Sequence, residues 1–225
     1  MVLMIGALSC KTTPADVPPA QTPTTTTATT TAAPPTAPKS LPRIIFFGNS
    51  LTAAYGLEPE QGYTALLQER LDSLGYEYKV VNAGLSGETT TGGLERIDWV
   101  LRRPLDIFVL ELGGNDGLRG TDPAITEQNL DAMIQKILAK YPEATILLAG
   151  MQAPPNMGST FTTAFKEIYP RLAAKYERVE LIPFLLKDVG GVPSLNLPDG
   201  IHPTAAGHRL LARNVWEVLE GVVER

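Results

Sequence analysis

A serine, an aspartate and a histidine are the residues of this chain whose types and spacing could perform nucleophilic chemistry. Ser50 follows Gly48 and Asn49 after an apolar run, and Asp199 and His202 stand three positions apart much later in the chain. A serine hydroxyl attacks well when a base takes its proton, and that base needs a partner that fixes its tautomer. Asp199 could reach Nδ1 of His202 across a glycine turn and leave Nε2 free for Ser50. The pattern predicts acyl transfer to water.

Each of these residues also has a simpler interpretation. Ser50 could cap a helix, and Asp199 with His202 could form a surface ion pair or part of a metal site. Metal binding would need more ligands than the sequence offers nearby, so we predict neither a metal nor an organic cofactor. The other histidine, His208, falls on a predicted helix and is interpreted as a surface or packing residue.

Gly87 and Asn115 are candidates for stabilising the negative charge of such a reaction. Attack on an ester or thioester carbonyl creates an oxyanion, which needs preorganised hydrogen-bond donors. Gly87 could offer a backbone N–H that no side chain shields, and Asn115 could offer its amide. The alternatives are an ordinary turn glycine and an amide that caps a loop.

Strands and helices are predicted to alternate and to position these residues. Apolar runs indicate strands at residues 43–48, 78–82, 105–112, 145–151 and 179–183. Helical spacing of apolar residues predicts helices at 63–74, 91–102, 123–141, 161–176 and 210–222, with Pro170 kinking or breaking the fourth, while 184–201 reads as irregular. Continuously apolar strands indicate a parallel sheet covered on both faces, and therefore a three-layer α/β/α sandwich. The polar clusters then meet at one edge of the sheet.

Four blocks of residues, in this order along the chain, resemble the GDSL, or SGNH, hydrolase family over essentially all of residues 42 to 223. The blocks are Gly48-Asn49-Ser50-Leu51, Gly87, Gly114-Asn115-Asp116 and Asp199-x-x-His202-Pro203. The chain looks closest to the acyl-CoA thioesterase I, lysophospholipase and arylesterase branch. The resemblance implies a flavodoxin-like sheet of five parallel strands, with Ser50 as nucleophile, His202 as base and Asp199 as its orienting partner. It also implies an oxyanion hole made by the N–H groups of Ser50 and Gly87 and the Asn115 side chain.

One position departs from the family pattern. The family usually has Asp where this chain has Asn49. An Asn keeps a carbonyl oxygen that accepts hydrogen bonds in the loop, but it lacks the negative charge beside the nucleophile. We therefore expect a shifted activity or pH profile and retained function.

The predicted function is a serine esterase or thioesterase acting on short-to-medium acyl groups. Leu118, Pro155 and Met157 are predicted to border the acyl groove. The alternatives are a carbohydrate O-deacetylase of the same family and a non-catalytic surface lipoprotein. The predicted partner is a small acyl ester or thioester, and we expect a monomer. Nucleic acid is not expected as a partner, because residues 42 to 225 carry a formal charge of −6 and lack a basic stripe.

Residues 1 to 41 differ in composition from the rest of the chain. Residues 11 to 40 contain eleven Thr, seven Pro and six Ala and no aromatic residue, which predicts a disordered linker. The apolar run before Cys10 resembles the lipobox of bacterial lipoproteins, in which a signal peptide is cut before a cysteine that becomes lipid-modified. We predict a leader at 1–10, a linker at 11–41 and a hydrolase domain at 42–225, located in a bacterial cell envelope, with secretion as the alternative.

Overall fold

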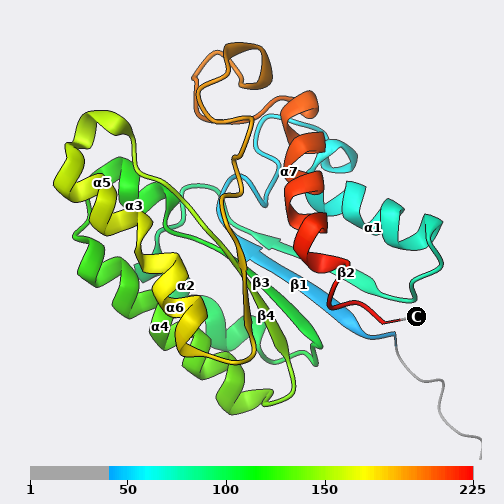
Figure 1. Ribbon diagram of the computed structural model, residues 1–225. Coiled ribbons are helices and arrows are strands. Elements are labelled where there is room, and N and C mark those ends of the chain that lie inside the picture. The colour runs from blue at the N-terminus through cyan, green and yellow to red at the C-terminus, as the bar shows by residue number, and fades with distance from the viewer. Residues whose placement is uncertain (1–40, 225) are drawn as a thin grey trace, which may run out of the picture. The chain divides into compact units, whose positions relative to one another are not determined.

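Five strands form one parallel sheet in the computed structural model, which describes residues 41–224 (Figure 1). Their order across the sheet is β2-β1-β3-β4-β5. The strands are β1 (Arg43–Gly48), β2 (Lys79–Gly84), β3 (Ile107–Glu111), β4 (Thr145–Ala149) and β5 (Val179–Ile182). This is the flavodoxin-like order, so the predicted sheet is confirmed.

Helices cover both faces of the sheet, as predicted for a three-layer sandwich. On one face lie α1 (Tyr63–Ser73) and α7 (Ala205–Leu219), which contact each other. On the other face, as Figure 1 shows, lie α2 (Thr90–Val100), α4 (Pro123–Lys140) and α6 (Ile168–Lys175), with α3 (Gly114–Arg119) and α5 (Ser159–Lys166) near the carboxyl ends of the strands. Within residues 41–224, three short 3-10 turns lie at Pro59–Gln61, Pro155–Met157 and Pro193–Leu195.

The core strands are apolar because helices bury both of their faces. Every residue of β3 is buried, and so is every residue of β1 after Arg43. The edge strand β2 has no fully buried residue. Burial on two sides removes the alternation of polar and apolar residues that one-sided sheets show.

The helix expected at 161–176, with Pro170 kinking or breaking it, is broken into two helices at Glu167, between α5 and α6. Pro170 lies within the first turn of α6, where its missing N–H has no helical partner to lose, so the break comes three residues before it. The stretch after the third strand, for which no helix is predicted, forms the short helix α3.

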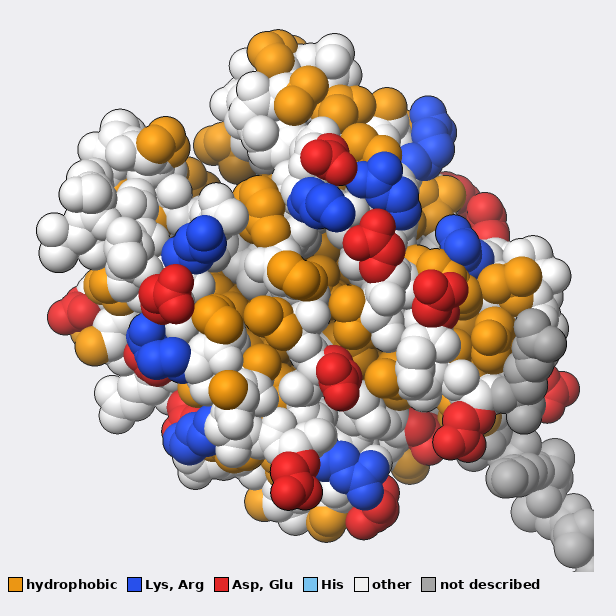
Figure 2. Space-filling view, viewed as in Figure 1, with side chains coloured by type: hydrophobic (Ala, Val, Ile, Leu, Met, Phe, Trp, Pro, Cys, Tyr) orange, Lys and Arg blue, Asp and Glu red, His pale blue; other side chains and the backbone are white. Residues whose placement is uncertain are grey.

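On the face seen in Figure 2, acidic and basic side chains are intermixed and do not separate by sign. Among the helices of residues 41–224, none has the length and hydropathy that crossing a bilayer requires. Cys10, the predicted leader and nearly all of the predicted linker lie outside the described residues.

Candidate active site

The candidate site lies where the direction of the chain across the sheet reverses. From β1, the chain passes to β2 on one side and then to β3 on the other. The loops after β1 and β3 therefore diverge and leave a crevice at the carboxyl ends of the two strands, which is where open parallel sheets bind ligands. Ser50 comes two residues after β1, and Asn115 comes four residues after β3.

Ser50, His202 and Asp199 form one hydrogen-bonded series. The Ser50 Oγ lies 3.0 Å from Nε2 of His202, and Nδ1 of the same ring lies 2.7 Å from Oδ2 of Asp199. Because Asp199 at its usual ionisation only accepts hydrogen bonds, Nδ1 carries the proton in this contact and Nε2 is left to accept from the Ser50 hydroxyl. The geometry thus joins an alcohol, an imidazole and a carboxylate from opposite ends of the chain.

A tight turn holds Asp199 in place. Its Oδ1 accepts hydrogen bonds from the backbone N–H groups of Ile201, at 2.9 Å, and His202, at 3.0 Å. Gly200 between them has a φ of +70°, a left-handed conformation that glycine adopts without strain. The hydrogen bonds from the backbone and ring of His202, followed by that from Ile201, lower the pKa of Asp199 to about 2. Asp199 is therefore an anion at neutral pH.

The ring of Tyr55 packs on the ring of His202. Their centroids lie 4.4 Å apart, although the Tyr55 side chain is half exposed. The backbone N–H of Tyr55 donates to the carbonyl of Ser50 at 3.0 Å, so the turn after the serine carries this aromatic ring. Tyr55 had no predicted role, although it belongs to residues 48–56, a stretch that contributes to the family resemblance.

Asn115 and Gly87 belong to two loops that are tied together. The Asn115 side-chain amide donates to the carbonyl of Glu88 at 2.9 Å, and Arg119 donates to the carbonyl of Gly87 at 3.1 Å. Buried Asp116 accepts from the N–H and hydroxyl of Thr90 at the first turn of α2, which locks α3 against α2. An amide NH₂ has two hydrogens, so Asn115 keeps one for a ligand.

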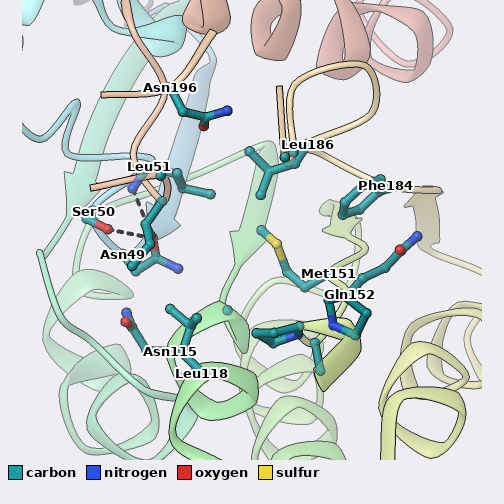
Figure 3. Close-up of a pocket in the computed structure, with 18 residues that line it drawn as sticks. Asn49, Ser50, Leu51, Asn115, Leu118, Met151, Gln152, Phe184, Leu186 and Asn196 are labelled. Atoms are coloured by element: carbon teal, nitrogen blue, oxygen red, sulfur yellow. Dashed lines mark hydrogen bonds between the residues drawn. The ribbon is translucent and has the colours of Figure 1, made fainter. Parts of the chain in front are cut away.

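A cavity of about 460 Å³ opens beside Ser50. Figure 3 shows Ser50 and Asn115 on one side of it, and Met151, Phe184 and Leu186 on the other. Its eighteen lining residues are uncharged, and its surface is mostly apolar. Such a cavity accommodates an uncharged organic group next to the serine.

Two of the three predicted groove residues line this cavity. Leu118 and Pro155 do so, and Met157 does not. Met157 ends the 3-10 turn after β4, and its methyl group lies beside Gly120, where it borders a separate shallow hollow with Phe161. The sequence predicts an irregular segment after β5, so Phe184 and Leu186, which border the far side, were missed.

Glu111 is a further buried residue at the site. It ends the central strand β3 with no exposed surface, and its carboxylate accepts hydrogen bonds from Asn49 and Thr52 on either side of Ser50. Burial, only partly offset by these hydrogen bonds, raises the pKa of Glu111 to about 7. An acid within an otherwise apolar central strand was the signal in the sequence that could have identified it.

His208 takes a packing role, consistent with the sequence interpretation. It is buried, and its Nδ1 accepts the backbone N–H of Tyr63 at the start of α1. Burial, with a smaller contribution from the charge of His202, lowers the pKa of His208 to about 4. Within residues 41–224, no group of three or more His, Cys, Asp and Glu side chains has the arrangement of a metal site.

Comparisons with known proteins give a consistent result. The model of the GDSL-like Lipase/Acylhydrolase family matches residues 46–210. Esterase TesA of Pseudomonas aeruginosa is 47% identical over 179 residues, which are 79% of this chain and 87% of that protein. Thioesterase 1/protease 1/lysophospholipase L1 of Escherichia coli strain K12 is 38% identical over 181 residues, 80% of this chain and 84% of that protein. The crystal structure of TesA, at 46% identity, superposes with a TM-score of 0.76 over 80% of this chain and 99% of that one.

Proposed function

The chain belongs to the GDSL-like lipase/acylhydrolase family, and from this premise we propose that Ser50, His202 and Asp199 are the catalytic residues of its ester hydrolysis. The protein is a serine esterase or thioesterase, a carboxylic ester hydrolase whose substrates are small acyl esters. The observation that carries the assignment of residues is the series of contacts from Ser50 through His202 to Asp199 at the mouth of an uncharged cavity.

The reaction proceeds in two steps through an acyl-enzyme. The Ser50 oxygen attacks the acyl carbonyl while its proton passes to Nε2 of His202, and the Asp199 carboxylate stabilises the imidazolium that forms. His202 then gives this proton to the leaving alcohol or thiol as the bond to it breaks. Water, deprotonated by His202, attacks the acyl-Ser50 ester and releases the acid, and the proton returns to Ser50.

Three donors stabilise the oxyanion in both steps. We assign them as the backbone N–H groups of Ser50 and Gly87 and the second amide hydrogen of Asn115. The hydrogen bond from Asn115 to Glu88 and that from Arg119 to Gly87 hold two of these donors in place before the substrate binds. Such preorganisation lowers the barrier because the donors need no rearrangement as charge develops.

The acyl group is proposed to be uncharged and of short to medium length. This follows from the cavity of about 460 Å³, whose lining holds no charged side chain. A sugar substrate, as expected for a carbohydrate O-deacetylase, would favour several converging polar groups, whereas Met151, Phe184 and Leu186 present apolar surface to the cavity. The acyl-ester assignment is therefore preferred.

A substrate series tests the assignment. The purified protein is assayed with p-nitrophenyl esters from acetate to long-chain acyl groups, with acyl-CoA thioesters and with acetylated xylan. The same assays are run on Ser50→Ala and on a matched control, Ser73→Ala, at the end of α1. We expect kcat/KM to rise from acetyl to medium chains, Ser50→Ala to be inactive, and a fluorophosphonate to label the wild type and Ser73→Ala only. Activity restricted to acetylated sugar would identify the deacetylase, and absent labelling would identify a non-catalytic protein.

We also propose that the hydrolase domain is residues 42–225 and that Cys10 carries a lipid tether to a bacterial envelope. This rests on the sequence pattern of the leader and the Thr- and Pro-rich tract, which precede the first strand at Arg43. Expression in a bacterium with radiolabelled palmitate tests the tether, beside a Cys10→Ser variant. Label in the wild type alone supports it, and equal absence of label contradicts it.

A further inference from the structure

Glu111 is fully buried beneath the nucleophile loop, residues 49–52, and accepts four hydrogen bonds from it. Its Oε2 accepts from the backbone N–H of Asn49 at 3.1 Å, and from the N–H and hydroxyl of Thr52 at 3.3 and 2.8 Å. Its Oε1 accepts from Nδ2 of Asn49 at 2.7 Å. All four donors are neutral. Because Asn49 precedes Ser50 and Thr52 follows it by two, this one carboxyl group holds both ends of the loop.

The contact to Glu111 determines how the Asn49 amide is oriented. With Nδ2 directed at Glu111, the Oδ1 atom accepts the backbone N–H of Leu51 at 2.9 Å and lies 3.4 Å from the Ser50 Oγ (Figure 3). A flipped amide would place NH₂ against an N–H and oxygen against a carboxylate, so both contacts would be lost together. Glu111 thus fixes an acceptor beside the nucleophile.

Two further features show that the loop is built around this carboxylate. The Thr52 hydroxyl lies 2.8 Å from Glu111 and 2.8 Å from the hydroxyl of Tyr63. A carboxylate only accepts, so Thr52 donates to it and accepts from Tyr63. Gly48 has no side chain at the point where Thr52 and Glu111 approach it, and an added Cβ there would collide with both.

We propose that Glu111, as a carboxylate, is a positioning residue for hydrolysis that holds Asn49 and Thr52 so that Ser50 faces His202. The proposal rests on the function assigned above to Ser50. It also explains how this chain works with Asn49 where its family usually has Asp. The Asn49 amide supplies a donor to Glu111, whereas an aspartate at this position would share a proton with it.

Several ionisable groups on neighbouring elements bear on the charge of Glu111. Tyr63 of α1 and Tyr169 of α6 are both buried, and the pKa of each is raised well above its usual value by burial first and by nearby carboxylates second. These phenols stay neutral. Further ionisable groups lie near the nucleophile loop. Arg96 of α2 is paired with Glu88, and its Nη2 lies 3.5 Å from the Gly48 carbonyl. Asp116 lies on α3, and His202 and His208 lie at either side of the start of α7.

Protonation of Glu111 should therefore reduce activity. A protonated carboxyl loses acceptor capacity while all four donors remain, so the loop relaxes. With a pKa raised to about 7 by burial, Glu111 gains this proton as the pH falls through neutrality. We therefore expect kcat to fall as the pH drops below neutrality, with part of this fall caused by protonation of Glu111.

Glu111→Gln, Asn49→Asp and the double variant test the proposal with p-nitrophenyl butyrate. In Glu111→Gln the new amide NH₂ faces Nδ2 of Asn49, and we expect kcat to fall about tenfold to a hundredfold with KM within about twofold, because small misplacements of a nucleophile act on kcat. When Asn49→Asp is combined with Glu111→Gln, the amide NH₂ at position 111 donates to the carboxylate at position 49, and the amide oxygen accepts the remaining donors. The double variant should therefore recover most of the loss.

The single variant Asn49→Asp gives a second, independent readout. Two carboxyl groups at hydrogen-bonding distance retain one shared proton, which restores the donor between them. The acid-side fall of kcat should therefore move to lower pH than in the wild type. A residue of purely structural importance would change the melting temperature and leave this pH profile in place.

The outcomes separate the proposal from the function on which it rests. Wild type without esterase activity would overturn the function. An active wild type with Glu111→Gln at full kcat, or a double variant no better than Glu111→Gln, would overturn the role of Glu111 alone. If Glu111→Gln does not fold, an unchanged pH profile in Asn49→Asp would overturn it equally. Glu180→Gln, at an exposed position of β5, is the matched control and should behave as the wild type.

Discussion

Asp199 and Glu111 each reach Ser50 through one intermediate residue, but from opposite environments. Asp199 acts through His202 from a loop where its side chain is 39% exposed, and hydrogen bonds from His202 and Ile201 lower its pKa to about 2. Glu111 acts through Asn49 from the end of the central strand, where burial raises its pKa to about 7. In the proposed roles, the carboxylate of Asp199 on the solvent side supplies negative charge to His202, and the carboxyl group of Glu111 on the buried side holds the loop around Ser50 in place.

The difference follows from where each carboxyl lies relative to water. An exposed carboxylate costs little to ionise, so Asp199 can stabilise the positive charge that forms transiently on His202 in the proposed reaction. A buried one is ionised only at the cost of desolvation and needs several donors around it, which hold the surrounding chain in place. Replacement of either should slow the enzyme, by different amounts and with different pH dependence.

The largest expected effect comes from Asp199→Asn. Without the carboxylate, the imidazolium loses its stabilising charge and the ring favours the wrong tautomer, so we expect kcat to fall by about 10⁴ with little change in KM. Steady-state kinetics with p-nitrophenyl butyrate measure this. The loss should exceed that of Glu111→Gln by a wide margin, and a smaller loss than in Glu111→Gln would reverse the comparison.

Asn115→Ala should have the next largest effect. Removing one oxyanion donor typically raises the barrier by ~2.7 to 4 kcal/mol, so kcat should fall by about 10² to 10³. Melting temperature should change little, since Asp116 still ties α3 to α2 through Thr90. Asn129→Ala is the control, because it removes a side-chain amide on α4 that donates to the Thr90 hydroxyl. Equal activity in Asn115→Ala and the wild type would contradict the assignment of Asn115 to the oxyanion hole.

The pH dependence of stability should separate the two carboxyl groups by sign. The folded protein holds the Glu111 proton more tightly than the unfolded chain does. The stability that this protonation contributes is therefore complete below pH 4.5 and is lost as the pH rises to about 7. Between those limits the wild type should lose on the order of 3 kcal/mol relative to Glu111→Gln. The contribution of Asp199 has the opposite sign and is lost as the pH falls from 3.8 to about 2.

Urea unfolding at several pH values tests this contrast. As the pH rises across that window, the unfolding free energy of the wild type should fall relative to that of Glu111→Gln. The difference between wild type and Asp199→Asn should stay flat there. His208 also contributes to the wild-type curve, because its lowered pKa makes stability fall as the pH drops from 6.5 to about 4, but it does so equally in both variants. Parallel curves for Glu111→Gln and wild type would show that Glu111 does not titrate in this range.

The comparison also shows what the sequence could and could not reveal. The order of strands and helices was predictable because apolar runs and helical spacing are local signals. The contact between Ser50 and His202 was predictable because their motifs are specific. The link from Glu111 to Asn49 was not, because it joins residues 62 positions apart and depends on the register of β1 against β3. Likewise, the sequence does not show that His208, on the first turn of α7, is buried in the core, whereas His202 precedes this helix.

The smallest expected effect concerns Tyr55, whose ring packs on His202 while its backbone N–H donates to the carbonyl of Ser50, in the loop that Glu111 holds. An aromatic face beside an imidazolium contributes about 0.5–1 kcal/mol at an exposed site, so Tyr55→Ala should lower kcat about twofold to fivefold and Tyr55→Phe should not. If Glu111 positions this loop, Glu111→Gln already displaces the ring. Tyr55→Ala should then cost less in that background than in the wild type, and a double-mutant cycle on kcat measures the difference. Strict additivity would mean that Glu111 does not influence the contact between the rings of Tyr55 and His202.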